Sequence, residues 1–386
     1  MKNVLLVGCG AEIGAMLVGM NEPQKDGFRI SAILTHPIFE DSKHLGLGAL
    51  DSLYARIVLA QPQLLDDVEC DPASEELICR GNRIKVHWGD CIDFDLSKLG
   101  KQFEVCILAT SKTHIGDDAI IGRFGDVANF VIGVAEAAQI PSLYPNLIGV
   151  PERFLANPPR ALNGHRVMCV GSCQSNGWQA QLRPIFEMAE ELDFESLEIL
   201  GLEIDIIHPD TPAGRLGTKS IEARSQDPRD NLRPSFSQVE MAMNLLFPDS
   251  NNINTISLRT LIMPPGYQIC RFFFRYQIAN GVRLTRDDVE HRFAGVAKRL
   301  PKTLRMADRP LGSRGFEASE ASAIVLAGER YFRYCDNPFK IDNPAKQAVS
   351  RILTQAYVHN VRGYCRSVLD TVQHLLTENS PRVFFD

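Results

Sequence analysis

The N-terminus of the chain is a short apolar run that passes directly into a glycine-rich turn. Val4-Leu5-Leu6-Val7 contains no polar residue, which is typical of a parallel strand buried on both faces. Gly8, Gly10 and Gly14 follow in a G-x-G-x-x-x-G spacing, and apolar residues then recur at helical spacing. Glycines in such a turn let a pyrophosphate approach free backbone N–H groups at the helix N-terminus. The pattern predicts a strand, a turn and a helix, which serve either as a dinucleotide site or as a plain structural turn.

The end of the next apolar run bears on which dinucleotide would bind. Phe28 to Leu34 is the second expected strand, and Thr35-His36-Pro37 follows where an acidic residue ordinarily binds the adenosine ribose. A carboxylate at that place repels a 2′-phosphate, whereas a threonine and a histidine leave room and donors for it. NADP is therefore at least as strongly indicated as NAD, unless these residues form a strand end with no ligand role.

Three later apolar runs extend the expected sheet. Phe103 to Thr110, Ala128 to Val134 and Arg166 to Val170 alternate with helical stretches and so predict a doubly wound parallel sheet. The edge at Thr110-Ser111 suits the nicotinamide half of the cofactor. Residues Ala60 to Arg80 have mixed charge and little periodicity, which suggests a surface excursion. The cofactor-binding residues expected from this half of the chain are Gly8, Gly10, Glu12, Ile13, Gly14, Thr35, His36, Thr110 and Ser111.

Composition excludes several classes of protein. The 386 residues suffice for two or three domains, and a net charge of -6 without a basic block does not favour nucleic acid as a partner. Ten cysteines occur without a C-x-x-C pair, so we expect no metal site and a reducing compartment. No apolar run approaches the roughly 18 residues that a membrane span requires. We therefore expect a cytoplasmic protein without membrane association.

A cysteine near the middle of the chain is the candidate nucleophile. Cys173 follows the expected strand Arg166 to Val170, and His208 ends the apolar-rich run Leu197 to Ile207, which predicts a strand that delivers its last residue to a site. A neighbouring imidazole stabilises the thiolate, the reactive form of cysteine. Taken alone, Cys173 has the alternative of being a small buried apolar residue.

Several segments resemble the phosphorylating glyceraldehyde-3-phosphate dehydrogenase family. Ser172-Cys173-Gln174-Ser175-Asn176 is similar to its Ser-Cys-Thr-Thr-Asn nucleophile motif, and Ile207-His208-Pro209-Asp210-Thr211 is similar to its strand-borne Val-His-x-x-Thr. Leu50 to Arg56 resembles its Tyr-Asp-Ser-Thr-His-Gly-Arg stretch. Tyr357 to Asp370 resembles its Trp-Tyr-Asp-Asn-Glu-x-Gly-Tyr-Ser-x-Arg-Val segment. The similarities occur in the same order as in the family and span nearly the whole chain.

The resemblance implies an α/β fold with a Rossmann doubly wound parallel sheet plus an α+β catalytic domain of the glyceraldehyde-3-phosphate dehydrogenase type. The dinucleotide-binding domain would comprise residues 1–171 and 360–386, and the catalytic domain residues 172–359 with an antiparallel or mixed sheet. A helix from Asn360 to Leu376 would pack back on the first domain. Asn360 would bind the nicotinamide carboxamide, supported by Tyr364. A homo-oligomer, either a tetramer or a dimer, is also implied.

Both phosphate sites of that family are altered here. The Pro-Ser-Ser-Thr-Gly motif reads Pro234-Ser235-Phe236-Ser237-Gln238, where Ser237 can replace the threonine. The arginine for the substrate phosphate falls at Ile262, three residues from Arg259. The segment Arg215 to Pro234, which would line a neighbouring subunit's cofactor pocket, contains five cations that could meet a 2′-phosphate or an acidic substrate, or form a solvated loop. The expected substrate-binding residues are Ser172, Asn176, Thr211, Arg233, Ser237 and Arg259.

The activity implied by the resemblance is an NAD(P)-dependent aldehyde dehydrogenase or acyl reductase. The Cys173 thiolate would attack an aldehyde to form a thiohemiacetal, with His208 as the acid–base group, and oxidation would give a thioester. Phosphate, water or another nucleophile would release the acyl group. Two alternatives remain: a non-catalytic relative that keeps the fold as a binding subunit, and an acyl-transfer enzyme without hydride transfer. The altered phosphate sites indicate an aldehyde other than glyceraldehyde 3-phosphate.

Overall fold

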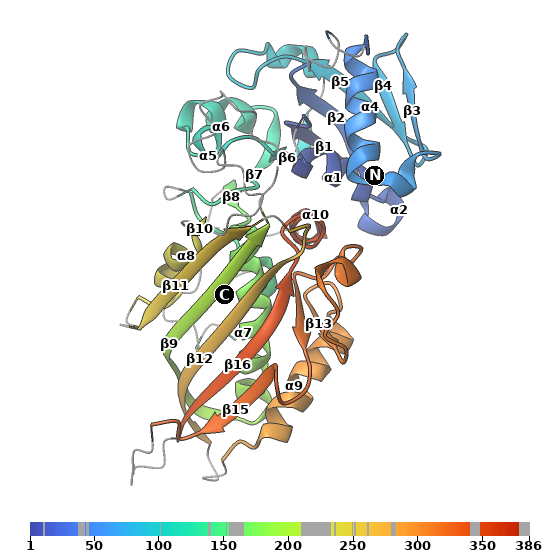
Figure 1. The fold of residues 1–386 in the computed structure, drawn as a ribbon. Coiled ribbons are helices and arrows are strands. Elements are labelled where there is room, and N and C mark those ends of the chain that lie inside the picture. Colours follow the sequence, from blue (N-terminus) through green and yellow to red (C-terminus); the bar gives the residue numbers. More distant parts are fainter. Residues whose placement is uncertain are drawn as a thin grey trace. The chain divides into compact units, whose positions relative to one another are not determined.

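The chain folds into two compact units (Figure 1). The computed structural model describes residues 1–10, 12–37, 43, 46–100, 102–137, 140–151, 153, 166–209, 233–234, 237–248, 250, 252–260, 262–278, 283–339 and 348–377. Unit 1 comprises Met1–Pro145, Arg160–Gly171 and Cys365–Asp386, and unit 2 comprises Asn146–Pro159 and Ser172–Tyr364. The described part of each unit contains an eight-stranded sheet with helices. The expected mixed α/β class with two sheets is therefore confirmed.

Unit 1 is built on a largely parallel sheet. Its parallel strands lie in the order β5-β2-β1-β6-β7-β8, so that chain order reads 3-2-1-4-5-6 and reverses between β1 and β6. The strands expected from the apolar runs are present. Their bounds are β1 (Lys2–Val7), β2 (Phe28–Thr35), β6 (Phe103–Leu108), β7 (Ala128–Gly133) and β8 (Val167–Cys169), and β5 (Asn82–Trp88) lies beyond β2.

The interpretation of residues 60–80 as a surface excursion was wrong. Here β3 (Val68–Asp71) and β4 (Glu76–Cys79) form an antiparallel hairpin that extends the sheet from β5. Val68, Leu77 and Cys79 are buried, whereas the residues between them include exposed or half-buried acids. Only one face of this hairpin packs on the core, and a short strand with one buried face has too few apolar residues to form an apolar run.

The core of unit 1 lies between its sheet and its helices. Buried side chains of β1, β2, β6 and α6 (Asp118–Gly125) form one cluster that includes Leu5, Leu34, Phe103 and Phe124. No helix in the described residues is long and apolar enough to cross a membrane. The helical elements of the unit are α1 (Glu12–Met20), α2 (Pro23–Asp26), α4 (Ala49–Ala60), η1 (Pro62–Leu64), η2 (Leu96–Leu99), α5 (Lys112–Ile115) and α6 (Asp118–Gly125), with η3 (Pro145–Leu147) and α10 (Arg362–Thr377) at its boundaries with unit 2.

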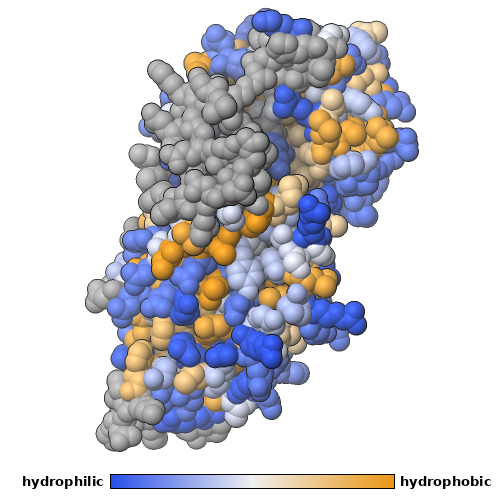
Figure 2. All heavy atoms as spheres, in the orientation of Figure 1, coloured by the Kyte–Doolittle hydropathy of each residue, from blue (hydrophilic) through white to orange (hydrophobic). Residues whose placement is uncertain are grey.

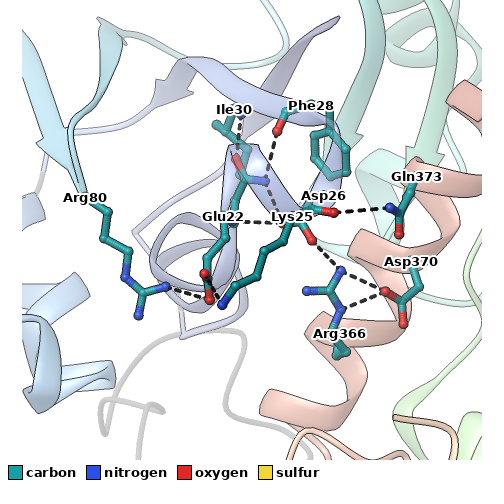
Figure 3. A network of polar contacts seen from close by, with 10 residues as sticks. Glu22, Lys25, Asp26, Phe28, Ile30, Arg80, Arg366, Asp370 and Gln373 are labelled. Carbon is teal, nitrogen blue, oxygen red and sulfur yellow. Dashed lines mark hydrogen bonds and ion pairs between the residues drawn. The ribbon is translucent and has the colours of Figure 1, made fainter. Parts of the chain in front are cut away.

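A buried ion pair ties the C-terminal helix to the N-terminal segment of unit 1 (Figure 3). The guanidinium of Arg366 on α10 lies 2.8 Å from Asp26 Oδ1 at the end of α2 and 2.7 Å from Asp370. The side chains of Arg366 and Asp26 are only 6% and 2% exposed. Burial alone would lower the pKa of Arg366, but the charges of Asp370 and Asp26 outweigh it and raise that pKa. This ion pair joins residues that are 340 positions apart in the chain. Removing either partner would leave a buried charge unpaired and would destabilise the fold.

Unit 2 is built on a mixed sheet. Its order is β10-β11-β9-β12-β16-β14-β13, with β15 also paired to β16. The β9–β12 and β12–β16 pairs are antiparallel, whereas β11 runs parallel to β9. The strands are β9 (Phe194–Pro209), β10 (Arg233–Pro234), β11 (Ile253–Thr260), β12 (Gly266–Ile278), β13 (Leu304–Ala307), β14 (Ala323–Leu326), β15 (Phe332–Asp336) and β16 (Ala348–Val358). The helical elements are α7 (Cys173–Glu191), α8 (Val239–Leu246), α9 (Arg286–Arg299) and η6 (Ser313–Phe316).

The two faces of this sheet differ. Along β12 and β16 every second residue is buried, and α7 packs on that face through contacts with β9, β12, β14 and β16. The opposite face mixes charged and apolar side chains (Figure 2). On that face Arg271 pairs with Asp205 at 2.8 Å, and Arg275 pairs with Glu198 at 2.7 Å.

Arg366→Met is expected to lower the free energy of unfolding of unit 1 by about 3–5 kcal/mol, because Asp26 would remain buried without its cation. The double variant Asp26→Asn/Arg366→Met removes both charges and should recover most of this loss. Urea titrations of the three proteins provide the measurement. A loss below about 1 kcal/mol in the single variant would show that the pair does not stabilise the unit.

Candidate functional site

Unit 1 contains a cavity at the carboxyl ends of its central strands. Its volume is about 380 Å³, within the range of about 300–1,000 Å³ usual for small-ligand sites. The cavity lies where the strand order reverses, between β1 and β6, which is where open parallel sheets bind ligands. Six residues expected from the sequence line it, namely Gly8, Gly10, Thr35, His36, Thr110 and Ser111. Gly89, Cys91 and His114 also line it and were not anticipated.

The glycine turn is dictated by close backbone approach. Gly8 has a φ of 90°, and a Cβ there would lie 2.5 Å from the carbonyl oxygen of Ala109. A Cβ at Gly14 would lie 2.1 Å from the carbonyl oxygen of Gly8, so Gly14 lets α1 pack directly on the turn. A Cβ at Gly10 would meet only Thr35, 4.0 Å away, and Gly10 faces the cavity. Gly8 therefore permits the tight bend of the turn, Gly10 leaves the backbone open to a ligand, and Gly14 lets the helix pack closely. These are the three roles that glycines have in a dinucleotide-binding turn.

The threonines of the cavity have different roles. Thr35 Oγ1 accepts a hydrogen bond from Cys9 N at 3.2 Å and so fixes the turn. Thr110 Oγ1 is buried and has no hydrogen-bond partner among the described residues. Because a buried hydroxyl ordinarily has a partner, Thr110 fits a polar ligand group in the cavity. Ser111 caps α5 by accepting from His114 N. Glu12 and Ile13, also expected to bind the cofactor, begin α1 and are not among the residues that line the cavity.

A carboxylate that was not anticipated lies behind His36. Asp90 follows β5, and its Oδ2 is 2.8 Å from His36 Nε2. A hydrogen bond from Ile92 N lowers the pKa of Asp90, burial opposes this, and His36 lowers it further. An ionised carboxylate therefore lies beside His36, a residue that lines the cavity, just beyond the end of the strand next to β2. The sequence pattern did not indicate Asp90, because the acidic residue of NAD-binding turns usually lies at the end of the second strand, which is β2 here.

In unit 2, Cys173 is the first residue of the long helix α7. Ser172 caps the helix by accepting from Ser175 N at 3.1 Å, and Asn176 donates through Nδ2 to the carbonyl of Ser172 at 3.1 Å. Both residues were expected to bind substrate, whereas these contacts hold the start of the helix. Free N–H groups and the positive end of the helix dipole stabilise a thiolate at this position.

The end of β9 approaches the start of α7 on the same face of the sheet. His208 and the buried residues Ile204 and Ile206 alternate along β9 towards the face that α7 covers. Gly266 at the start of β12 fits between the two segments. A Cβ there would lie 2.8 Å from the carbonyl oxygen of Ile207, 2.9 Å from Cδ of Pro209 and 3.4 Å from Nε2 of Gln174. The residues flanking His208 thus meet the neighbour of Cys173 at a glycine that the sequence did not single out.

A buried network of amides and a hydroxyl fixes α7 on the sheet. Gln268 of β12 donates through Nε2 to the carbonyl of Gln174 at 2.9 Å and to its Oε1 at 2.6 Å. Gln181 donates to Gln268 Oε1 at 3.1 Å and accepts from Thr354 of β16 at 2.7 Å. All four residues are at most 1% exposed. Because buried amides are costly without partners, the network favours one position of α7 and therefore of Cys173.

Two of the expected substrate cations lie in register with His208. Arg259 of β11 pairs with His208 of β9, and Arg233 of β10 pairs with Arg259. Adjacent strands are about 4.8 Å apart, so the backbones of these three residues form a row across the sheet. Ser237 is buried and accepts a hydrogen bond from Val239 N at the start of α8. Thr211 and most of the segment 215–234 lie outside the described residues.

The loop after β16 carries Asn360, the expected nicotinamide contact. His359 shapes this loop: its Nε2 lies 2.7 Å from the carbonyl oxygen of Glu317, and its Nδ1 accepts from Arg362 N at 3.1 Å. Burial lowers the pKa of His359 to about 4, so the ring is neutral near pH 7. Asn360 Oδ1 is buried without a hydrogen-bond partner among the described residues, which fits an amide donor from a ligand. Tyr364, the expected supporting residue, is buried on α10.

Burial raises the pKa of several other cysteines. Burial raises the pKa of Cys9 and Cys169 to about 12. Burial also raises the pKa to about 11 for Cys70, Cys79 and Cys91. Cys173 is half-buried, as is Cys70, but unlike these five it begins a helix, where backbone N–H groups are suited to a thiolate.

Comparison of the chain with protein-family models and with curated proteins finds no match. The residues and contacts described above therefore carry the functional interpretation.

Proposed function

We propose that this protein is an NAD(P)-dependent oxidoreductase that interconverts an aldehyde and an acyl group through a thioester on Cys173. One observation carries the proposal. The first residue of α7 is a half-exposed cysteine, and its neighbour Gln174 meets the residues that flank His208 at Gly266. A thiol at a helix N-terminus, on a helix whose next residue approaches the neighbours of a strand-borne histidine, is suited to nucleophilic catalysis.

The cofactor is assigned to unit 1, where the residues present fit a dinucleotide. The glycine turn offers open backbone at Gly10, and Thr110 offers a buried hydroxyl without a partner among the described residues. The order of the parallel strands is that of a Rossmann sheet, the finer fold that the proposal adopts. We further propose that unit 2 is of the glyceraldehyde-3-phosphate dehydrogenase type and that Asn360 binds the nicotinamide carboxamide.

The chain's own residues account for the covalent steps. The thiolate of Cys173 attacks the carbonyl carbon; a C–S bond forms and the carbonyl π electrons move to oxygen. The backbone N–H of Cys173 stabilises that oxygen, and His208, which holds the proton of the ionised thiol, donates it to the oxygen to give the thiohemiacetal hydroxyl. His208 takes this proton back as the C–H bond breaks and the carbonyl re-forms as a thioester. The nicotinamide cofactor supplies the hydride acceptor for this oxidation. The buried glutamine network keeps Cys173 in place throughout.

The proposed substrate is an aldehyde or acyl compound with an anionic group. Arg259 lies on the strand next to His208 and in register with it, so a negative group of the substrate would have a cation about one strand spacing from the acid–base residue. Ile262, which falls at the family's arginine, has its N–H bonded to the carbonyl of Thr260 just beyond β11 and offers no charge. We therefore propose a substrate shaped differently from glyceraldehyde 3-phosphate.

Cys173→Ser should abolish turnover while cofactor binding persists, because a serine hydroxyl is far harder to ionise than a thiol. Cys335→Ser is the matched control, since Cys335 is also half-buried in unit 2, and it should keep full activity. Iodoacetamide followed by mass spectrometry should find Cys173 labelled before the other nine cysteines. Earlier labelling of any other cysteine would count against the assignment of the nucleophile.

His208→Asn should slow turnover by about 10²- to 10⁴-fold, the usual effect of losing an acid–base group. Without the imidazole the thiolate forms only at higher pH, so the acidic limb of the pH–rate profile should move upward. His291→Asn changes an exposed histidine of α9 and should alter neither quantity. If the profile of His208→Asn matches that of the unaltered protein, His208 is structural.

Asp90→Asn should shift cofactor preference towards NADP by about tenfold, because it removes a negative charge near the place of the 2′-phosphate. His36→Asp should shift preference towards NAD, because the new carboxylate binds ribose hydroxyls and repels that phosphate. The ratio of dissociation constants for NADP and NAD, obtained from ligand-induced rises in melting temperature, measures both effects. A ratio unchanged in both variants would mean that the ribose does not bind at this edge.

A further inference from the structure

Unit 2 contains a second cavity whose lining is strongly cationic. It has a volume of about 370 Å³, again within the usual range for small-ligand sites. Four arginines line it, together with one carboxylate and two aromatic rings. These residues are Arg286, Arg330, Arg333, Arg351, Glu329, Phe332 and Tyr334.

The arginines come from separate elements. Arg286 is the first residue of α9, Arg330 lies in the turn between β14 and β15, Arg333 lies on β15 and Arg351 on β16. Phe332 packs edge-on against Phe293 of α9 with ring centroids 4.8 Å apart, which joins the helix to the strand. The cations are thus brought together by tertiary structure and do not form a solvated run on one helix.

The internal carboxylate does not balance this charge. Arg286 pairs with Glu329 at 2.5 Å and with Glu290 at 3.4 Å. Arg330, Arg333 and Arg351 form no ion pair with any residue that the structure describes. The Nε atoms of Arg286 and Arg351 are buried, and neither has a hydrogen-bond partner among the residues that the structure describes. Guanidinium donors in this state are suited to an anion that presents several acceptor oxygens.

The cavity is remote from Cys173 within unit 2. Val358 of β16 pairs with Gly266, which lies beside Gln174, and Arg351 pairs with Phe273 of β12. The two pairs are seven residues apart, about 23 Å at the rise of an antiparallel strand. The arginines therefore do not belong to the row that contains His208, Arg259 and Arg233.

We propose that this arginine-lined cavity binds a phosphoryl group of a small ligand, at a site separate from the candidate active site. Phosphate is favoured over carboxylate because it carries about −1.5 to −2 charges at pH 7 and three acceptor oxygens, which match several guanidinium groups at once. Phe332 and Tyr334 also line the cavity.

Calorimetric titration of the full chain with pyrophosphate, at constant ionic strength, tests this site. Arg333→Gln and Arg351→Gln should each weaken binding by about 10- to 100-fold, the effect of losing one charge-assisted contact. Arg309→Gln is the matched control, because it removes an exposed arginine of unit 2 that does not line the cavity, and it should change nothing. Arg333 is exposed, so its substitution should leave the fold intact.

Pyrophosphate bound at the glycine turn of unit 1 would be insensitive to both arginine variants, so the outcome does not depend on the proposed enzymatic function. Acetate provides the comparison with a carboxylate and should bind far more weakly. Absence of saturable pyrophosphate binding, equal weakening by Arg309→Gln, no effect of Arg333→Gln and Arg351→Gln, or equally tight acetate binding would each overturn the proposal.

Discussion

The candidate active site depends on the buried hydrogen bonds that join α7 to the centre of the sheet in unit 2. Gln181 and Gln268 are fully buried, and each amide has directional partners on a different element. Apolar packing alone would allow α7 to slide or rotate at small cost, whereas a displaced glutamine would lose hydrogen bonds inside the protein. The network therefore defines where the helix begins relative to β9, and this in turn defines the position of the thiol.

The two units meet different chemical demands with different kinds of constraint. In unit 1 the constraint is steric: Gly8 and Gly14 let three backbone segments approach more closely than any side chain would permit. The proposed dinucleotide would need this open backbone, since a pyrophosphate contacts backbone N–H groups. In unit 2 the constraint is polar, and the proposed nucleophile would need a fixed direction of attack. The spacing of glycines in a sequence indicates a steric constraint of the first kind. The hydrogen-bond partners of a buried glutamine cannot be identified from the sequence, because the fold brings them together.

The elements that could be predicted from the sequence are those in which apolar residues are concentrated. β1, β2, β6 and β9 each contain a run rich in apolar residues, and their positions and approximate bounds were predictable from those runs. β5 and the β3–β4 hairpin were missed because Arg83 and Lys85 alternate with buried Ile84 and Val86, as in any strand with one solvated face. Missing β5 also concealed Asp90, because a residue after an unrecognised strand has no predicted place at the sheet edge.

Strand register gives Arg259 a place that the spacing of the family pattern does not. Linear spacing from the family pattern puts the substrate arginine at Ile262, and three residues along a strand correspond to about 10 Å and to the opposite face. The parallel pairing of β11 with β9 instead aligns Arg259 with His208, and β10 adds the backbone of Arg233 to the same row. Register is set by contacts between distant segments, and single-chain spacing does not contain it. A cation can therefore keep its place in register with His208, the proposed acid–base residue, while its position in the sequence pattern moves, and this supports the proposal of an anionic substrate despite the altered phosphate motifs.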